Sequence, residues 1–472
     1  MYNEYEITQM PTSLKSCRDR IEQFLSANAL RLDKVDYYAV VTRLGDDTIL
    51  AGGGLAGDVI KCIAVDDSLR GTGMSQRLVS HLLSEARERG HHNVKVFTKP
   101  SNADIFESLG FKTIATSPLA ILMEEGIGGI ETYCTRLKAL RTDGDNGVIV
   151  MNCNPFTRGH RYLVEQAASR VNHLYVIVVN EDLSLFSATE RFEMAQNGCS
   201  DLKNVTVCHG SEYTISATTF PTYFLKRLED ASDTQMTLDL DLFARHIAPA
   251  LGAKTRFIGS EPDDCLTHRY NELMKQQLPG NGIDVVEIER LEERGNAVSA
   301  SSVRHCLATE NLNEALALVP DTSIPYLVAK TAVLSLRNEL ETTPKPGLVD
   351  LDNNGAHSDM DKALMDKSID SLAPYFDKLA LMGYATNLPQ ASDVIAVGLE
   401  AEKAMLEATN GVNTHRGALF SMGLAVTGIC HSLHNPQCNW QTAVSQIANE
   451  IPASEGTNGH NAHQRHNSKS AL

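Results

Sequence analysis

The sequence predicts a multidomain protein in which an α+β part, an α/β part and a mostly α part follow one another. Three observations predict this order. Short strands and helices mix up to about residue 140, strands and helices then alternate to about residue 322, and strand signals stop beyond that point. A length of 472 residues is too great for one ordinary hydrophobic core. We expect domains at 1–141, 147–322 and 323–455, with a final segment at 456–472.

In the first part, the apolar run Val59–Val65 predicts a strand and the stretch Met74–Arg89 predicts a helix. The polar stretch T-D-G-D-N, Thr142–Asn146, is typical of a linker. After it, apolar runs predict strands at 147–151, 174–179, 205–208, 255–258 and 285–288, with helices at 161–171 and 189–196. Such alternation favours a parallel sheet with helices on both faces.

The third part shows long helical patterns at 326–341, 394–409 and 417–431, so we expect it to be mostly α. The last segment, Gly456–Leu472, has almost no apolar residues and contains three histidines. Such a composition cannot bury enough apolar surface to fold, so this segment is predicted to be disordered.

Composition and charge exclude several classes of function. Lys and Arg number 42 against 59 Asp and Glu, a net charge of −17, so no nucleic-acid partner is expected. We find no run of about 18 apolar residues and no basic, apolar leader at Met1–Lys15, so we expect neither a membrane span nor a signal peptide. The ten cysteines lie scattered without a C-x-x-C pair, which predicts reduced thiols in the cytoplasm and no metal site built from them.

The sequence N-P-F-T-R-G-H, Asn154–His160, stands directly after a predicted strand and before a predicted helix. Backbone N–H groups and the helix dipole favour an anion at such a turn. Gly159 lets the backbone or a purine approach closely, and His160 can donate a hydrogen bond to an α- or β-phosphate. The same residues are also compatible with a simple β-to-α turn closed by a capping residue.

A second motif, V-S-A-S-S-V-R at Val298–Arg304, opens another predicted helix. Ser299 can cap this helix, while Ser301 and Arg304 can reach phosphate oxygens from one helical turn. In isolation the motif could equally be an ordinary serine-capped surface helix. In this order on an α/β background, the two motifs together predict a nucleotide site.

The pair of motifs resembles the T/H-x-G-H and I-S-x-[ST]-x-x-R signatures of the nucleotidyltransferase (HIGH) superfamily, whose Rossmann-like domain binds ATP. In that family a nucleophile attacks the α-phosphate and expels pyrophosphate. The longer strings Asn154–Ala167 and Phe257–Pro262 resemble the citrate lyase ligase family, over roughly Met1–Leu327. This resemblance implies ATP with Mg²⁺, acetate, and the acyl carrier (gamma) subunit of citrate lyase as reactants.

The resemblance also implies roles for individual residues. Thr157, His160 and Arg304 would be catalytic. Thr157 stands where many superfamily members carry a first histidine, so His160 and Arg304 are expected to carry more of the charge. Arg191 would bind phosphate or form a surface ion pair. The residues expected to line the nucleotide pocket are Asn154, Phe156, Gly159, Gly259, Ser260, Glu261, Ser299 and Ser301; for Gly259–Glu261, a plain strand-to-loop turn is the alternative.

In the N-terminal part, the loop D-D-S-L-R-G-T-G-M-S at Asp66–Ser75 precedes a helix, and S-N-A-D-I-F-E-S-L-G-F follows at Ser101–Phe111. Both strings resemble the GNAT acetyltransferase fold, in which such a loop wraps the pyrophosphate of coenzyme A. The residues expected to bind a coenzyme-A-like arm are Arg70, Gly71 and Gly73.

Two features of this part bear on its activity. Ser75 replaces the usual final Gly or Ala of the loop, and no general base is evident. We therefore favour docking of the carrier's prosthetic arm over acetyl transfer from acetyl-CoA, with a purely structural remnant as the other alternative.

In the third part, the strings at Thr343–Met360 and Gly411–Ala418 gather charged and metal-capable groups between helices. On chemistry alone they predict either a phosphate-plus-Mg²⁺ site or polar loops of a helical bundle. The candidate residues are Lys345, Asp350, His357, Asp359, Asn413 and His415. The strings resemble the triphosphoribosyl-dephospho-CoA synthase family, which joins the triphosphoribosyl part of ATP to dephospho-CoA and releases adenine.

The family's domain is longer than the stretch Ser323–Leu472. We therefore expect this part to be cut short or read out of frame near its end, and to be inactive on its own. For the whole chain, the main prediction is ATP-dependent acetylation of the prosthetic-group thiol of the citrate lyase acyl carrier. The alternatives are nucleotidyl transfer to a phosphorylated cofactor such as phosphopantetheine, and GNAT-type protein acetylation from acetyl-CoA without ATP.

Overall fold

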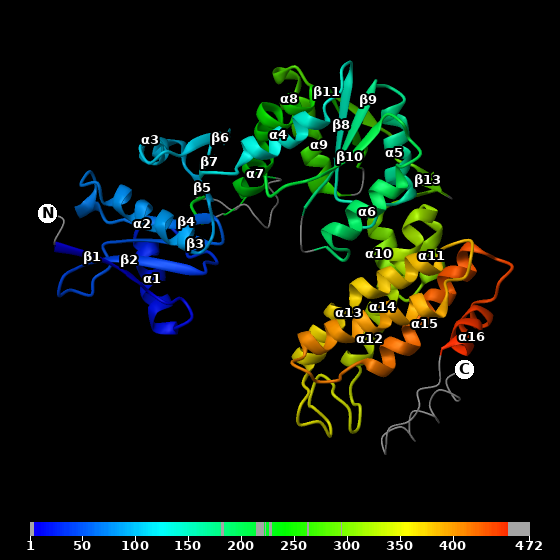
Figure 1. Ribbon diagram of the computed structural model, residues 1–472. Helices are drawn as coiled ribbons and strands as arrows, with labels where there is room; N and C mark the ends of the chain where they lie inside the picture. Colours follow the sequence, from blue (N-terminus) through cyan, green and yellow to red (C-terminus); the bar gives the residue numbers. More distant parts are fainter. Residues whose placement is uncertain are drawn as a thin grey trace. The chain divides into compact units, whose positions relative to one another are not determined.

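The computed structural model describes residues 4–180, 184–213, 221, 223–225, 229–261, 264–293 and 295–451 (Figure 1). The chain divides into two compact units. The first comprises Met1–Met151, Leu163–Asn180 and Leu202–Arg290, and the second comprises Asn152–Tyr162, Glu181–Asp201 and Leu291–Leu472. The expected segment 456–472 lies outside the described residues.

The first unit begins with a seven-stranded sheet in the order β1-β2-β3-β4-β5-β7-β6. Its strands are β1 Tyr5–Gln9, β2 Tyr37–Arg43, β3 Ala51–Ala56, β4 Val59–Val65, β5 Asn93–Thr98, β6 Lys112–Thr116 and β7 Ile121–Gly126. Its helices are α1 Lys15–Ala27, α2 Met74–Glu88, α3 Ala103–Glu107 and α4 Ile130–Leu140. The predicted strand at Val59–Val65 is confirmed, and α2 ends one residue before the predicted helix does.

The neighbours β4 and β5 are the parallel pair of this otherwise antiparallel sheet, and they share only two residue pairs, Val59 with Lys95 and Ile60 with Val96. Beyond these pairs the two strands lose their mutual backbone hydrogen bonds. A ladder that stops early leaves room between the strands, which becomes important for the site described below.

The first unit continues into a five-stranded parallel sheet in the order β10-β9-β8-β11-β12. Its strands are β8 Asn146–Met151, β9 His173–Val178, β10 Val205–His209, β11 Ala253–Gly259 and β12 Asp284–Ile288. The associated helices are α7 Glu229–Leu242, a π-helical turn Phe243–Ile247, α8 Ala248–Leu251 and α9 Cys265–Gln277, together with α5 Arg158–Ala168, whose first turn belongs to the second unit. The predicted parallel sheet is confirmed. Its strand order reverses between β8 and β11, the point at which open α/β sheets bind ligands beyond the strand ends.

One hydrophobic core runs through both sheets of the first unit. It includes Tyr38, Phe97 and Tyr133 from the N-terminal part, and Tyr175 and Phe243 from the parallel-sheet part. In the stretch T-D-G-D-N, expected to be a linker, residues 143–145 are exposed and the two ends are held by the fold. The backbone N–H of Thr142 donates to the Tyr175 hydroxyl at 2.8 Å, and Asn146, only 1% exposed, begins β8.

The second unit is mostly helical, and within it the described residues from 323 onward are mostly α, as predicted. Its helices are α6 Ala188–Gly198, α10 Ala300–Ala308, α11 Leu312–Ala317, α12 Ile324–Glu341, α13 Lys362–Gly383, α14 Ala391–Ala408, α15 Arg416–His434 and α16 Trp440–Glu450, with a short hairpin of β13 Glu292–Glu293 and β14 Asn296–Ala297. The helices α12–α16 share a core of their own. Within the described ranges, no helix has the length and apolar character needed to cross a membrane.

Candidate functional site

The loop that leaves β8 carries the first motif in a tightly held conformation. The Asn154 side chain is 8% exposed, and its Oδ1 accepts a hydrogen bond from the backbone N–H of Phe186 at 3.1 Å. Thr157 directly precedes α5, which begins three residues before the predicted helix. The carbonyl of Thr157 accepts the first helical hydrogen bond, from Arg161 N–H at 3.0 Å. The loop therefore delivers the motif to a helix N-terminus, as the sequence predicts.

Thr157 and His160 bond to each other within this first turn. His160 N–H donates to Thr157 Oγ1 at 3.2 Å, and Thr157 N–H donates to His160 Nδ1 at 3.0 Å. Thr157 Oγ1 also lies 3.0 Å from His160 Nδ1. Because Thr157 is 1% exposed, its hydroxyl is turned toward the histidine and away from solvent.

The second motif contacts the first. Arg304 Nη1 donates to the carbonyl oxygen of Asn154 at 2.6 Å. A Cβ added at Gly159 would lie 2.4 Å from the carbonyl oxygen of Val298, so only glycine allows the two segments to approach so closely. Partial burial lowers the pKa of the Arg304 guanidinium, which nevertheless stays a cation at neutral pH. The structure thus brings together Asn154, Gly159 and Arg304.

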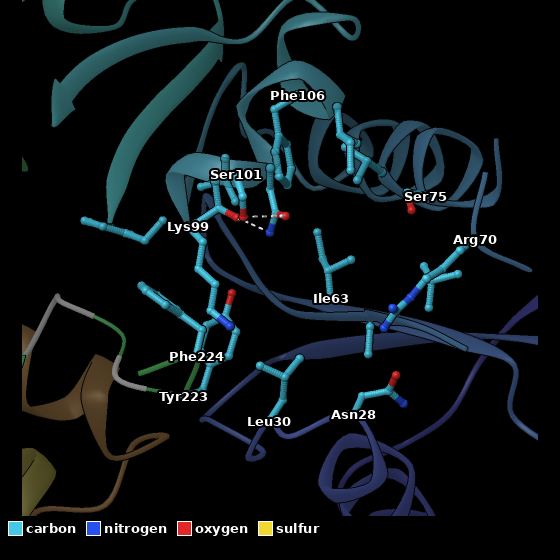
Figure 2. Close-up of a pocket in the computed structure, with 18 residues that line it drawn as sticks. Asn28, Leu30, Ile63, Arg70, Ser75, Lys99, Ser101, Phe106, Tyr223 and Phe224 are labelled. Carbon is cyan, nitrogen blue, oxygen red and sulfur yellow. Dashed lines mark hydrogen bonds between the residues drawn. The ribbon is translucent and has the colours of Figure 1, made fainter. Parts of the chain in front are cut away.

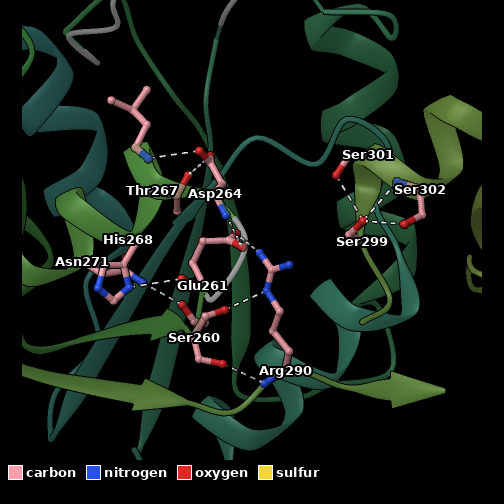
Figure 3. A network of polar contacts seen from close by, with 12 residues as sticks. Ser260, Glu261, Asp264, Thr267, His268, Asn271, Arg290, Ser299, Ser301 and Ser302 are labelled. Carbon is pink, nitrogen blue, oxygen red and sulfur yellow. Dashed lines mark hydrogen bonds and ion pairs between the residues drawn. The ribbon is translucent and has the colours of Figure 1, made fainter. Parts of the chain in front are cut away.

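The serines of the second motif cap α10. Ser299 Oγ accepts from the backbone N–H of Ser302 at 3.0 Å and lies 2.8 Å from Ser302 Oγ and 3.1 Å from Ser301 Oγ (Figure 3). Ser301 is exposed, and Ser299 is half-buried. Sequence reasoning did not single out Ser302, although the doubled serine in S-A-S-S was the available signal.

Two buried side chains support the loop. Phe156 is fully buried and stacks on the His160 ring, with centroids 5.8 Å apart and planes at 17°. Arg191 of α6 is also fully buried. Its Nε donates to the carbonyl of Phe186 at 3.1 Å and its Nη1 to the carbonyl of Asn152 at 2.9 Å. Arg191 is thus no surface residue: its guanidinium ties together two segments of the loop region.

The residues Gly259, Ser260 and Glu261, also expected to line the nucleotide pocket, belong to the first unit and follow β11. Arg290, which follows β12, donates from Nε to the Ser260 carbonyl at 2.7 Å and forms an ion pair with the Glu261 carboxylate (Figure 3). Ser260 Oγ accepts from Arg290 N–H at 3.2 Å. Glu261 is 7% exposed, so its carboxylate anchors a loop at the carboxyl ends of two parallel strands. Arg290 was not among the predicted residues.

The N-terminal part contains a cavity of about 480 Å³ where β4 and β5 part (Figure 2). Ile63–Val65 and Val96–Thr98 line it together with Arg70 and Ser75 of the glycine loop. Gly71 and Gly73 have φ of +74° and +82°, a conformation that favours glycine, and Gly73 caps α2. The side chain of Arg70 is 69% exposed and pairs with Asp67 at 2.7 Å.

The cavity has one wall that the sequence did not reveal. Tyr223 and Phe224, which precede α7 in the chain, line it as well (Figure 2). Both rings are buried and pack against each other edge to face, with centroids 5.2 Å apart. The carbonyl of Tyr223 accepts a hydrogen bond from Arg31 N–H at 3.4 Å. Nothing in the local sequence of this segment relates it to the glycine loop.

The six residues of the expected second site do not form a metal cage. Asp350 is 3% exposed, and its carboxylate accepts backbone N–H groups of Lys345, Asp352 and Asn353 at 2.9 Å each, which lowers the pKa of this carboxyl. Asp350 therefore closes a turn. Lys345 Nζ pairs with Glu339 at 3.0 Å. Across the described residues, no group of three or more His, Cys, Asp or Glu side chains could hold a metal ion.

The remaining members of this set lie in different settings. His415 is 6% exposed, its Nδ1 lies 2.8 Å from Ser368 Oγ, and burial lowers its pKa. Thr414 Oγ1 donates to the same Ser368 Oγ at 2.6 Å. Asn413 Oδ1 accepts from Arg416 N–H at 3.3 Å. His357 is half-buried and Asp359 is exposed. Ser368 and Thr414 were missed from the sequence.

This arrangement defines a class of protein: an α/β domain with a parallel sheet that follows a GNAT-like domain and precedes a helical one. Family comparisons give the same three parts. The acetyltransferase (GNAT) domain matches residues 16–120, the citrate lyase ligase C-terminal domain matches 146–327, and the ATP:dephospho-CoA triphosphoribosyl transferase family matches 325–458.

Comparison with individual relatives identifies the family to which the chain belongs. The chain is 42% identical over 314 residues to the citrate (pro-3S)-lyase ligase of Haemophilus influenzae, covering 65% of this chain and 94% of that protein. It is also 42% identical over 320 residues to the same ligase of Klebsiella pneumoniae, covering 66% and 93%. The chain belongs to the citrate (pro-3S)-lyase ligase family.

The helical part has relatives of its own. It is 40% identical over 165 residues to the 2-(5''-triphosphoribosyl)-3'-dephosphocoenzyme-A synthase of Escherichia fergusonii, covering 32% of this chain and 53% of that protein. Against the corresponding synthase of Haemophilus ducreyi, the identity is 44% over 118 residues, covering 35% of that protein. The chain thus spans about half or less of the length of these synthases.

Proposed function

We propose that the chain activates citrate lyase by acetylating the prosthetic-group thiol of its acyl carrier subunit at the expense of ATP. Membership of the ligase family supports ATP use and a citrate lyase substrate. The observation that carries the chemistry is the contact of the two motifs, through the 2.6 Å hydrogen bond from Arg304 to Asn154 and the approach of Gly159 to Val298.

In the proposed mechanism, an acetate oxygen attacks the α-phosphorus of ATP and the bond to the bridging oxygen breaks, so that pyrophosphate leaves with its electron pair. Arg304 supplies positive charge beside the developing pentavalent phosphorus, and His160 donates a hydrogen bond to its oxygens. The N-terminus of α5 adds oriented N–H groups. The carrier thiolate then attacks the acetyl carbon and releases AMP.

We propose that Mg²⁺ enters as part of the substrate Mg·ATP. In the described part of the chain no group of three or more His, Cys, Asp or Glu side chains could hold a metal ion, which supports the triphosphate and water as the ligands of the ion. Phe156 and Asn154 would then shape the pocket through the loop backbone, and Ser299 and Ser301 would donate hydroxyl hydrogen bonds to phosphate. By the family resemblance, Gly259, Ser260 and Glu261 are also proposed as nucleotide-binding residues. The ten cysteines are all free thiols, which supports a reducing, cytoplasmic location.

We propose that the N-terminal cavity holds the dephospho-CoA-like arm of the carrier. The positive-φ glycines present backbone N–H groups at the start of α2, and Arg70 stands at the same mouth. This would leave the acetyl chemistry entirely to the nucleotide site.

The main test is exchange of radiolabelled pyrophosphate into ATP. We expect exchange to require acetate, and acetylation of thiol-form citrate lyase to require both acetate and ATP. Exchange that requires a phosphopantetheine compound in place of acetate would favour nucleotidyl transfer. Acetyl transfer from acetyl-CoA without ATP would favour the acetyltransferase alternative.

A second candidate function, triphosphoribosyl transfer to dephospho-CoA, is proposed for the helical part because of its family match at 325–458. We expect this part to make no product alone, because two of its candidate residues are already engaged: Asp350 closes a turn and Lys345 pairs with Glu339. The test is incubation with ATP and dephospho-CoA. Stoichiometric release of adenine, lost in His357→Ala and Lys345→Ala, would overturn the expectation and assign the second site.

A further inference from the structure

The first turn of α5 is a capping box in which a histidine takes the place of the usual glutamate. In the common form, a Ser or Thr side chain accepts the backbone N–H three residues later, and a Glu or Gln at that position accepts the N–H of the capping residue. Here Thr157 Oγ1 accepts from His160 N–H at 3.2 Å, and His160 Nδ1 accepts from Thr157 N–H at 3.0 Å. Both halves of the box are present.

This box determines where the imidazole proton resides. A backbone N–H can only donate, so the Nδ1 atom that faces it must offer a lone pair. The Thr157 hydroxyl, 3.0 Å from the same Nδ1, can donate or accept, so the backbone N–H is the group that decides the tautomer. With Nδ1 committed as an acceptor, the proton of the neutral ring lies on Nε2.

We infer that Thr157 is a positioning residue that holds His160 as the neutral Nε2–H tautomer, so that the histidine acts on the nucleotide as an uncharged donor and Arg304 supplies the cation. The role of His160 on the nucleotide rests on the proposed function, whereas the tautomer of its ring rests on geometry alone. Phe156 stacks on the same ring at 5.8 Å and holds its plane.

The inference separates two roles for Thr157. If the hydroxyl contacted phosphate directly, its loss would weaken ATP binding. If it orients His160, its loss would leave ATP binding nearly unchanged and slow the chemical step, because a donor that swings by about 1 Å can lose roughly 10²-fold in rate. The buried position of the hydroxyl, with Thr157 1% exposed, favours the second role.

The tautomer can be measured without substrate. In the full chain labelled with ¹⁵N-histidine, long-range ¹H–¹⁵N correlations near neutral pH should show Nε2 protonated and Nδ1 bare for the ring signal that His160→Gln removes. An Nδ1–H tautomer or a doubly protonated ring would overturn the inference. Because no nucleotide is present, this result does not depend on the proposed reaction.

Kinetics supply the second readout. Thr157→Val keeps the branched shape and the backbone N–H but loses the hydroxyl. We expect a roughly 10- to 100-fold fall in kcat for acetate-dependent exchange, a KM for ATP within about twofold of wild type, and rescue by Thr157→Ser. A rise in KM without loss of kcat would assign the hydroxyl to phosphate and overturn the inference.

A matched control separates this role from simple helix capping. Asn439 caps α16 by accepting Gln441 N–H at 2.8 Å, far from the nucleotide motifs in sequence. Asn439→Ala should lower the melting temperature while leaving kcat and the His160 signals unchanged. If Asn439→Ala lowered kcat as much as Thr157→Val, the kinetic effect would be one of stability and the inference would fail. Absence of acetate-dependent exchange in the wild-type chain would instead overturn the proposed function.

Discussion

The guanidinium of Arg304 and the backbone carbonyl of Asn154 are joined by a hydrogen bond of 2.6 Å across 150 residues of sequence. A guanidinium has further N–H groups in a fixed plane, so one can hold the loop while others reach a phosphate oxygen. An ammonium on a flexible stem cannot maintain both contacts. Arg304 therefore holds the two motifs together through a hydrogen bond and also contributes a positive charge.

Arg304→Lys should consequently reduce kcat for acetate-dependent pyrophosphate exchange by roughly 10²-fold. The fold should persist, because the side chain is only partly buried. Arg337→Lys is the matched control, since Arg337 pairs with Asp370 on the helical part. Wild-type kinetics for Arg304→Lys would show that Arg304 is not part of the site.

His160→Ala should cost roughly 10²–10³ in kcat, with a smaller change in the apparent affinity for ATP. The reason is that a donor at the α-phosphate matters most when charge accumulates there in the transition state. Steady-state exchange at varied ATP measures both parameters, and thermal unfolding reports the accompanying loss of the helix cap. Full activity in a correctly folded variant would contradict the assigned site.

Arg70→Ala should raise the KM for the citrate lyase carrier roughly tenfold while leaving pyrophosphate exchange unchanged. Arg70 lines the cavity between β4 and β5, whereas the nucleotide motifs begin at Asn154. The comparison variant is Lys112→Ala, which removes an exposed ion pair with Glu131. Equal carrier kinetics for both variants would argue against arm binding in this cavity.

The carboxyl group of Asp377 in α13 should make the free energy of unfolding depend on pH. Burial is the largest cause that raises the pKa of Asp377 to about 7; the neighbouring Glu190 and Glu193 contribute to this rise, and Lys330 opposes it. In the unfolded chain an aspartate ionises near pH 4. Between about pH 4 and 7, the folded state therefore binds a proton that the unfolded state has lost, and stability falls as pH rises.

Asp377→Asn should remove this slope and stabilise the helical part above pH 7 by roughly 1–3 kcal/mol. The chain's one tryptophan, Trp440, lies in α16, so its fluorescence during urea unfolding reports on the right region. Asp370→Asn, an exposed carboxyl on the same helix, is the control. An unchanged pH slope in Asp377→Asn would refute the assignment.

Much of the fold could be predicted because apolar runs mark strands directly. Val59–Val65 is a strand with the predicted ends, and the five parallel strands lie within one or two residues of their predicted positions. Helix starts were less accurate, since α5 begins at Arg158 through the Thr157 cap, which periodicity does not register. The helix α13 was not singled out, and it contains Pro374, which interrupts a helical pattern in sequence.

The candidate site was predictable where it is local and unpredictable where distant residues meet. The T-x-G-H and S-S-V-R motifs could be recognised in the sequence. The complete burial of Arg191 could not be predicted, because the stretch A-T-E-R-F-E-M resembles a surface helix.

The sequence also could not show whether the first part would fold separately from the rest of the chain. Tyr213 donates to the buried carboxylate of Glu124 at 2.5 Å, so deleting residues 1–140 would leave buried polar groups of the sheet part without partners.

The aromatic wall of the N-terminal cavity has a consequence for synthesis on the ribosome. The strands β4 and β5 emerge early, but Tyr223 and Phe224 emerge only after most of the parallel sheet has been translated. Nascent chains tend to fold from the N-terminus onward. The cavity therefore stays one wall short while the first domain is otherwise complete, and a nascent chain can close it only after β8, β9 and β10 have been translated, before β11 and β12 follow.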